Sequence, residues 1–186
     1  MPNLTPEPQF ATPTLRIATP ADSLCLSALA IQVFLDTYAR DGIRAALARE
    51  ALTTFSHTEF DRAIADPHTC VVLAELNAHL VGFAQIKLAA EHELAPRGAQ
   101  SELLRLYVQE PFTHQQIGSK LLSEAESVAA AHGAAVLWLT PWVHNHRALA
   151  FYARRGYQDH GLTYFTFEGE SHANRLFAKH LTSRAA

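Results

Sequence analysis

Residues 145–157 read Asn-His-Arg-Ala-Leu-Ala-Phe-Tyr-Ala-Arg-Arg-Gly-Tyr and contain both a helix start and a helix stop. The side-chain oxygen of Asn145 can accept from a free backbone N–H of a first helical turn, and Gly156 suits the left-handed position that ends a helix. Between them there is room for about three helical turns. Residues seven apart share one helix face, so Asn145 and Tyr152 are expected to point the same way. The segment predicts a short helix that presents an amide and a phenol together.

The rest of the chain alternates between strand-like and helix-like patterns. The expected strands cover residues 14–18, 70–76, 80–88, 102–108, 135–140, 162–168 and 174–181, and the other expected helices cover 24–41, 43–52, 58–65 and 117–132. A chain of 186 residues that is 48% apolar suffices for one domain with a full core and is too short for two ordinary ones. We expect residues 1–13, which hold four prolines, to be a mobile lead-in and residues 14–186 to form one domain.

Composition and charge disfavour several kinds of partner. The formal net charge is −3 and no run of Lys or Arg offers phosphate contacts, so we expect no nucleic-acid partner. No apolar run approaches the ~20 residues that span a bilayer, and the N-terminus lacks a basic segment followed by an apolar one, so we expect a cytoplasmic protein with no membrane partner. Cys25 and Cys70 lie in apolar surroundings and are expected to be buried and unpaired. His144 and His146 lack a carboxylate at ligand spacing, so no metal site is expected.

A second informative segment joins the predicted strand that ends at Val108 to the helix that begins near Ile117. The turn between them brings consecutive backbone N–H groups to the head of a helix, where the helix dipole also favours negative charge. Such a helix end can bind a pyrophosphate group. The alternative, an ordinary strand-turn-helix connection without a ligand, stays open on this pattern alone.

The pattern Asn145-x-x-Ala148-x-x-Phe151-Tyr152-x-x-x-Gly156-Tyr157, preceded by an apolar run, resembles the C-terminal half of the GCN5-related N-acetyltransferase (GNAT) superfamily. The resemblance implies an α/β (α+β) fold with a mixed, mostly antiparallel sheet of about seven strands flanked by helices. It also implies acetyl-CoA as co-substrate, no metal, and a position for Tyr152 beside the thioester sulfur. Taken singly, Asn145 would only cap its helix and Tyr152 would only pack, and that interpretation stays open.

The phosphate loop of this superfamily reads Gln/Arg-x-x-Gly-x-Gly/Ala, and the corresponding residues here are Thr113, Gln116 and Gly118. Only Gly118 matches. A residue with a Cβ at position 116 still offers its N–H if its φ is negative, so we expect CoA binding with reduced affinity. The superfamily's strands splay at this site and expose N–H groups to the pantetheine arm and the acetyl carbonyl. The resemblance assigns to the cofactor Leu106, Tyr107, Val108, His114, Gln115, Gln116, Ile117, Gly118, Ser119 and Asn145.

Two side chains are candidates for the chemistry of acetyl transfer. Glu102, at the start of the central strand, is the candidate base acting through water, and its alternative is an exposed charge at a strand end. Tyr152 is the candidate acid. Because a Tyr hydroxyl titrates near 10 and an alkyl thiol near 8.5, a hydrogen bond that stabilises the departing thiolate describes its role better than complete proton transfer.

Within the superfamily the chain most resembles the bacterial spermidine/polyamine N-acetyltransferases, over residues 33–38, 102–108 and most of 137–181, including Trp142. That group tends to have acidic residues where this chain has Val143 and Asn174. The expected acceptor is therefore a small-molecule primary amine of polyamine type, attacked directly in a ternary complex. An amino-acid or protein N-terminal amine, and a non-catalytic acyl-CoA-binding sensor, stay open as alternatives. A second copy of the chain, as a homodimer, is also open as a partner.

Overall fold

The computed structural model describes residues 12–167 and 170–182. The expected lead-in, residues 1–13, lies outside this range except for its last two residues. Residue 168, the end of an expected strand, and Gly169, the first residue of the turn expected at 169–172, lie outside it as well.

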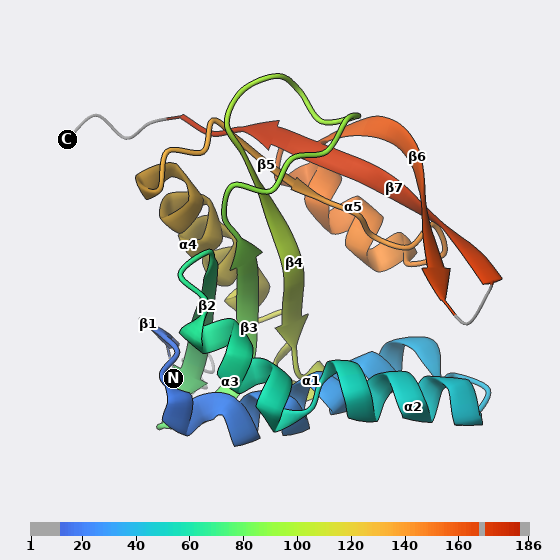
Figure 1. Ribbon diagram of the computed structural model, residues 1–186. Helices are drawn as coiled ribbons and strands as arrows, with labels where there is room; N and C mark the ends of the chain where they lie inside the picture. The colour runs from blue at the N-terminus through green and yellow to red at the C-terminus, as the bar shows by residue number, and fades with distance from the viewer. Residues whose placement is uncertain (1–11, 168–169, 183–186) are drawn as a thin grey trace, which may run out of the picture.

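A seven-stranded sheet forms the centre of the described molecule, in the order β1-β2-β3-β4-β5-β7-β6 (Figure 1). Every neighbouring pair is antiparallel except β4 and β5, which are parallel. The strands are β1 (Thr14–Ile17), β2 (Thr69–Leu76), β3 (His79–Lys87), β4 (Gln100–Val108), β5 (Val136–Leu139), β6 (Gln158–Phe167) and β7 (Glu170–His180). The predicted mixed, mostly antiparallel sheet is confirmed.

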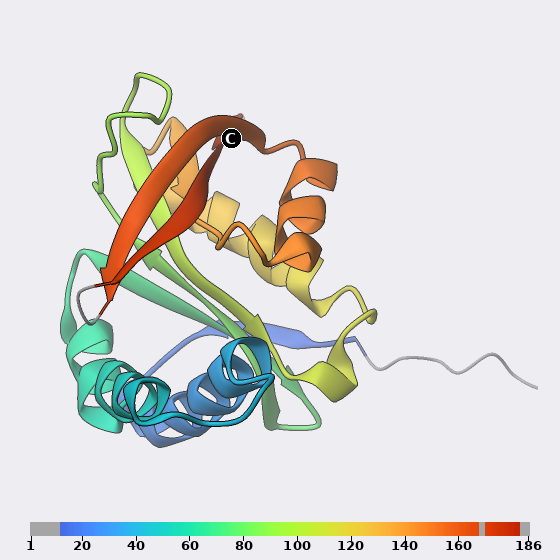
Figure 2. The same ribbon diagram turned by 90° about the vertical axis from the view of Figure 1, so that its right-hand side faces the viewer.

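Helices cover both faces of the sheet, with α1–α3 on one side and α4 and α5 on the other (Figure 2). They are α1 (Ser23–Tyr38), α2 (Ala45–Thr54), α3 (His57–Ala65), α4 (Ile117–Ala131) and α5 (His146–Arg154), with short 3-10 turns η1 (Pro20–Asp22) and η2 (Glu110–Phe112). Alternation along β2 separates two cores. Val72 and Ala74 pack in the cluster with α4, whereas Val71 and Leu73 pack with α1 and α3.

Local sequence explains the boundaries of α5. The Asn145 side chain accepts from the backbone N–H of Ala148 at 3.1 Å, as an N-cap residue does. Gly156 has φ +84°, the left-handed conformation in which glycine ends helices at least cost. The predicted helix start and stop are confirmed.

Several sequence expectations differ from the structure. β7 begins at Glu170, and not at residue 174, because residues 170–173 pair with residues 164–167 of β6 where a turn was expected. β4 begins at Gln100, because its first three residues pair with β5, and not at residue 102. β6 begins at Gln158, and not at residue 162, because a register shift at Gly161 lets a polar segment continue the strand. The prediction that Cys25 is buried is wrong, since it lies on the exposed side of α1, although both cysteines are free.

The contact between β4 and β5 is short. It consists of three residue pairs, from Gln100 with Val136 to Glu102 with Trp138. Beyond this point β5 follows β7, whereas β4 continues beside β3 to Val108. The remaining six residues of β4 therefore have a paired edge toward β3 and no strand beside them on the other edge in the described part of the chain (Figure 1).

Residues 12–167 and 170–182 contain neither a membrane-spanning helix nor a cluster of metal-binding side chains. No helix there combines the length and the apolar character that crossing a bilayer requires. No group of three or more His, Cys, Asp or Glu side chains there is arranged to hold a metal ion.

Gly82 on β3 tests how closely the strands and α4 are packed. A Cβ at this position would lie 2.7 Å from the backbone oxygen of Tyr107 and 3.2 Å from Cδ1 of Leu121. Because the backbone oxygen belongs to a paired strand, Gly82→Ala is expected to lower the free energy of unfolding by about 1–3 kcal/mol in urea denaturation. Gly118→Ala is the control, since its Cβ would meet its nearest neighbours at 3.8 and 3.9 Å. Equal stability of the two variants would contradict this packing.

Candidate active site

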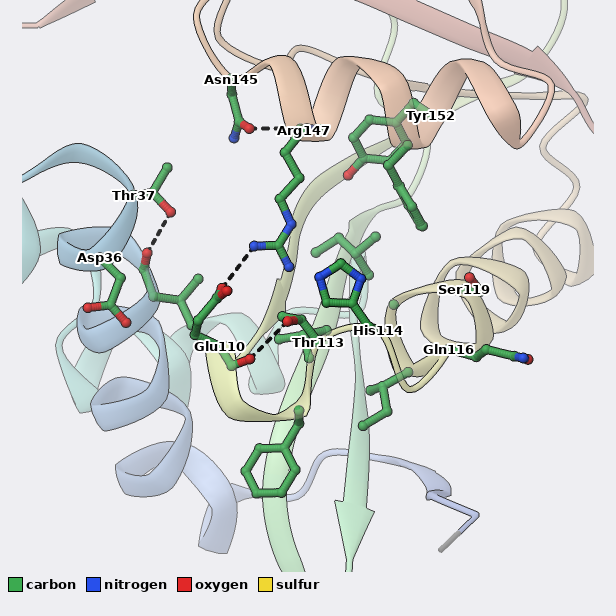
Figure 3. A pocket seen from close by; sticks show the side chains of 18 of the residues that line it. Asp36, Thr37, Glu110, Thr113, His114, Gln116, Ser119, Asn145, Arg147 and Tyr152 are labelled. Carbon is green, nitrogen blue, oxygen red and sulfur yellow. Dashed lines mark hydrogen bonds and ion pairs between the residues drawn. The ribbon is translucent and has the colours of Figure 1, made fainter. Parts of the chain in front are cut away.

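A cleft of about 820 Å³ opens where β4 and β5 separate. It is lined by α1, the connection after β4, the start of α4, and α5 (Figure 3). Nine of the residues predicted from the sequence line it: Leu106, Val108, His114, Gln116, Ile117, Gly118, Ser119, Asn145 and Tyr152. Segments that are far apart in the chain therefore meet in one place.

The backbone of β4 presents free groups to this cleft. Gln109 N–H donates to Val81 O at 3.0 Å, and the register continues with Gly82 opposite Val108 and Phe83 opposite Tyr107. Since hydrogen-bonded and non-hydrogen-bonded pairs alternate in an antiparallel ladder, the N–H groups of Leu106 and Val108 point away from β3, toward the gap.

Tyr107 differs from the residues on either side of it. Its N–H points toward β3 by the same alternation, and its side chain packs on the opposite face of the sheet, with ring centroids 5.5 Å from Phe83 and 6.1 Å from Phe55. Of the predicted stretch 106–108, Leu106 and Val108 are therefore the two residues whose backbone N–H groups face the cleft.

The loop before α4 has an unusual backbone. His114 and Gln116 have φ values of +63° and +61°, in the left-handed region that favours glycine. The condition stated for Gln116, a negative φ, is thus not met, and the residue takes the glycine-like conformation in spite of its Cβ. Left-handed backbone costs about 1–2 kcal/mol in a residue with a Cβ. The loop keeps a shape that exposes successive N–H groups, as anion-binding nests do.

Basic side chains outnumber acidic ones in the cleft. Four arginines, Arg40, Arg147, Arg154 and Arg155, line it together with two carboxylates, Asp36 and Glu110, and Glu110 is paired with Arg147. Arg155, directly after α5, donates to the Ser119 hydroxyl in the first turn of α4 and lies over the Phe151 ring. The free N–H groups and dipole of the 15-residue helix α4 add to this field. This end of the cleft is suited to a phosphate-bearing ligand.

Tyr152 directs its hydroxyl into the cleft from α5 (Figure 3). The side chain is 8% exposed, with ring centroids 5.2 Å from Phe151 and 5.7 Å from Tyr157. Burial raises the pKa of the Tyr152 phenol above its usual value, so it remains protonated at neutral pH. No hydrogen bond to the described residues occupies this hydroxyl, so it is available to a ligand.

Asn145 and Gln115 have partners within the protein. The Asn145 side-chain oxygen caps α5, and its amide NH₂ is left to face the cleft. Gln115 does not line the cleft, and its side chain donates to Pro111 O at 3.3 Å.

Glu102 lies outside this cleft. It lines a second hollow of about 850 Å³ between β2–β4 and the helices α2 and α3, on the other face of the sheet. Burial raises the pKa of the Glu102 carboxyl to about 7, against a smaller lowering by Arg105. A carboxyl that titrates near neutral pH is suited to accept a proton.

No local pattern identified several other residues of the cleft. Asp36 and Thr37 reach it from α1 and Arg40 from the turn after α1, and their polar side chains look like those of any exposed surface. Glu110 and Arg147 form an ion pair of 2.8 Å across the cleft, although 37 residues separate them in the chain (Figure 3).

Known proteins share this architecture. A family model described as "Acetyltransferase (GNAT) family" matches residues 36–157. An uncharacterized N-acetyltransferase of the pepI 3′ region of Lactobacillus delbrueckii subsp. lactis is 28% identical over 131 residues, which are 69% of this chain and 75% of that protein. The spermidine N(1)-acetyltransferase of Thermoplasma acidophilum is 27% identical over 128 residues, 68% of this chain and 71% of that protein. The crystal structure of the Thermoplasma acidophilum PaiA N-acetyltransferase in complex with coenzyme A superposes with a TM-score of 0.71 at 21% identity, covering 91% of this chain and 99% of that one.

The strained loop gives a stability prediction. Gln116→Gly removes about 1–2 kcal/mol of left-handed strain and adds about 0.4–1 kcal/mol of unfolded-state entropy, so it is expected to stabilise the fold by up to about 1 kcal/mol. Gln115→Gly is the matched control. Gln115 is not among the residues with positive φ, so its replacement relieves no strain and only increases the entropy of the unfolded chain. Urea denaturation compares the two variants. A Gln116→Gly protein no more stable than Gln115→Gly would show that position 116 is not strained.

Proposed function

The chain belongs to the acetyltransferase (GNAT) family and is an acyl-CoA-dependent N-acetyltransferase, and from this premise we propose that it transfers acetyl from acetyl-CoA to a primary amine of a small molecule. One observation carries the proposal. A single cleft holds the free backbone edge of β4, the N–H-rich loop before α4 and the hydroxyl of Tyr152. They offer hydrogen-bond donors for a carbonyl, a phosphate and a departing thiolate within one cleft.

Acetyl-CoA would lie with its pyrophosphate at the loop and first turn of α4, near Gln116, Gly118 and Ser119. Its pantetheine arm would continue along the open edge of β4, where the N–H groups of Leu106 and Val108 and the Asn145 amide are available. The coenzyme A complex of the PaiA N-acetyltransferase, which shares the fold, supports this use of the cleft.

The reaction proposed is direct attack in a ternary complex. The amine nitrogen forms a bond to the acetyl carbon, and the carbonyl oxygen takes on negative charge that the Leu106 N–H stabilises; such donors are worth several kcal/mol in a dry site. The C–S bond then breaks, and CoA leaves as thiolate. Tyr152 donates a hydrogen bond to that sulfur, and its raised pKa makes this stabilisation, and not complete proton transfer, its role.

The amine must be neutral when it attacks. Deprotonating an alkyl ammonium of pKa roughly 10.4 at pH 7 costs about 4–5 kcal/mol, so a base is required. Glu102 is the proposed base. It stands where β4 and β5 still pair and faces the side of the sheet opposite to α4, so it would take the proton through water from an amine approaching from that side.

A polyamine-like molecule is the acceptor class that the spermidine relative supports. Two positions modify this expectation. Val143 carries no charge, and Asn174 donates its amide to Thr140 O at 3.0 Å, so neither supplies a carboxylate for a second ammonium group. An amino-acid or N-terminal amine therefore belongs in the same test.

The direct test is CoA release from acetyl-CoA with spermidine, spermine, amino acids, aminoglycosides and short peptides, alongside thermal-shift titration with acetyl-CoA. Turnover with one amine class would support the proposal and identify the acceptor. Stabilisation by acetyl-CoA without turnover would favour the sensor alternative. Neither stabilisation nor turnover would contradict the assignment of the cleft to acetyl-CoA.

Two further expectations stay predictions. One is cytoplasmic location. The other is a homodimer, for which the edge strand β6 offers the exposed apolar side chains Leu162, Tyr164 and Phe165, and which analytical ultracentrifugation tests.

Tyr152→Phe is expected to lower kcat by roughly tenfold or more, because the thiolate loses its hydrogen bond, while the Kd for CoA is unchanged. Tyr157→Phe is the control, since that hydroxyl is bonded to Glu126 at 3.1 Å and does not line the cleft. Steady-state kinetics with calorimetric CoA titration measures both. Full activity of Tyr152→Phe would exclude a catalytic role for the Tyr152 hydroxyl.

The pH dependence of activity in the Glu102→Gln variant tests whether Glu102 is the base. The carboxyl must be ionised to accept a proton, so wild-type kcat/KM is expected to rise through a limb near pH 7, and the variant is expected to be slower and to lack that limb. Since the folded pKa lies above the unfolded one, ionisation destabilises the fold, and wild-type stability should fall from about pH 4.3 up to about pH 7. Glu102→Gln should not show this fall. Glu59→Gln, whose carboxylate is paired with Arg62, is the control; an unchanged pH profile in Glu102→Gln would exclude Glu102 as the base.

A further inference from the structure

The acceptor's side of the sheet can be identified from β4. Leu106 and Val108 direct their side chains to the core that holds α4. On this face α4 and α5 bring the N–H-rich loop and Tyr152 to the cleft, whereas α1 borders the cleft from the other face. An amine that attacks the thioester therefore approaches from the opposite face, where alternation places the side chains of Arg105 and Tyr107. The second hollow, of about 850 Å³, lies on that face.

Four of the six charged side chains that line this hollow form ion pairs. Lys87 binds Asp66 at 2.7 Å, and Arg62 binds Glu59. The two charged side chains on β4 are the exceptions: neither Glu102 nor Arg105 has an oppositely charged group within 4.0 Å among residues 12–167 and 170–182.

Arg105 is held in place but not neutralised. One of its nitrogens donates to Oε1 of Gln85, a side chain that is itself only 5% exposed, and its guanidinium carbon lies 5.0 Å from the centroid of the Phe55 ring. Glu50 and Glu102 act on it only at longer range, without an ion pair, and the Glu50 carboxylate accepts from the Thr54 hydroxyl at 2.8 Å. A guanidinium has five N–H donors, so most of them have no acceptor within the described protein.

An unneutralised guanidinium at the floor of a hollow is costly unless an anion binds there. Its planar set of donors matches a carboxylate in a bidentate pair. Arg105 also directly precedes Leu106, whose N–H faces the donor cleft, and the two Cα atoms are about 3.8 Å apart. The anion site and the reacting carbonyl therefore lie on opposite faces of the same short stretch of strand.

We infer that the amine acceptor also carries a carboxylate, which Arg105 binds on the α2–α3 face of β4 while the amine reaches the thioester beside Glu102. The acceptor class is then an amino-carboxylic acid. A diamino acid satisfies both this requirement and the resemblance to polyamine enzymes, whereas a plain polyamine leaves Arg105 without a partner. The inference rests on the proposed acetyl transfer to a small-molecule amine.

Matched substrate pairs test the inference: lysine against 1,5-diaminopentane, ornithine against 1,4-diaminobutane, and alanine against ethylamine, each with acetyl-CoA. In at least one pair the member with the carboxylate is expected to have a roughly tenfold or higher kcat/KM, the usual worth of a charge-assisted hydrogen-bonded pair. Arg105→Gln is expected to abolish that preference through KM, with little change for the plain amine. Arg105→Lys, which keeps the charge but loses the planar pair of donors, should lie between.

Arg62→Gln is the control, because Arg62 lines the same hollow but is paired with Glu59; it should keep the preference. Thermal-shift titration with acetyl-CoA confirms that each variant is folded and binds the donor. Equal or better turnover of the plain amines, or an equal loss for both members of a pair in Arg105→Gln, would overturn the inference and leave the proposed function intact. No CoA release with any amine would overturn both.

Discussion

The parallel contact between β4 and β5 ends after three residue pairs, and the arrangement of the whole site follows from this. A strand edge that no neighbour covers leaves backbone N–H groups that must find a partner or stay in water. Here the uncovered edge belongs to the middle of the sheet, between two covered faces, and Leu106 and Val108 turn their N–H groups toward it. Inside a sheet, neighbouring strands ordinarily cover each other's edges by pairing. This edge of β4 is left open instead, and we propose that an extended ligand binds there.

The same separation gives the molecule two approaches to one reaction centre. α4 and α5 bring the phosphate loop and Tyr152 to one face, and α2 and α3 border the hollow with Glu102 and Arg105 on the other. A donor and an acceptor that enter from opposite faces meet without exchanging places, which agrees with direct transfer in a ternary complex. Because the two sites lie on opposite faces of the sheet, the basic groups near the loop before α4 are also kept apart from the carboxyl of Glu102.

The loop before α4 shows the conflict between local preference and function most clearly. Gln116 and His114 adopt left-handed backbone that glycine would take without strain, and the structure nevertheless keeps that shape. Strain of this kind persists where the surrounding structure over-determines a residue, and it is concentrated at ligand sites. The loop therefore keeps the N–H groups proposed to bind the pyrophosphate exposed, at the expense of some stability.

Patterns of short range allowed much of this to be predicted from sequence. Asn145 and Gly156 determine where α5 begins and ends, and hydrophobic alternation identified every strand that pairs on a buried face. The start of β6 was missed because residues 158–160 carry no alternation, and a bulge at His160 separates the pairs of Gln158 and Asp159 from the rest of the strand. The conformation of Gln116 and the places of Asp36 and Arg105 depend on contacts between distant segments, which no local pattern encodes.

Amide hydrogen exchange along β4, followed by NMR with and without acetyl-CoA, tests whether the donor binds the open edge of this strand. We expect the amides of Leu106 and Val108 to exchange fast in the free protein and to become protected when acetyl-CoA binds. The amide of Tyr107, which points toward β3, should exchange slowly in both states and serves as the internal reference. Protection of Leu106 and Val108 that is already present in the free protein, or that acetyl-CoA leaves unchanged, would contradict the assignment of the open edge of β4 to the donor.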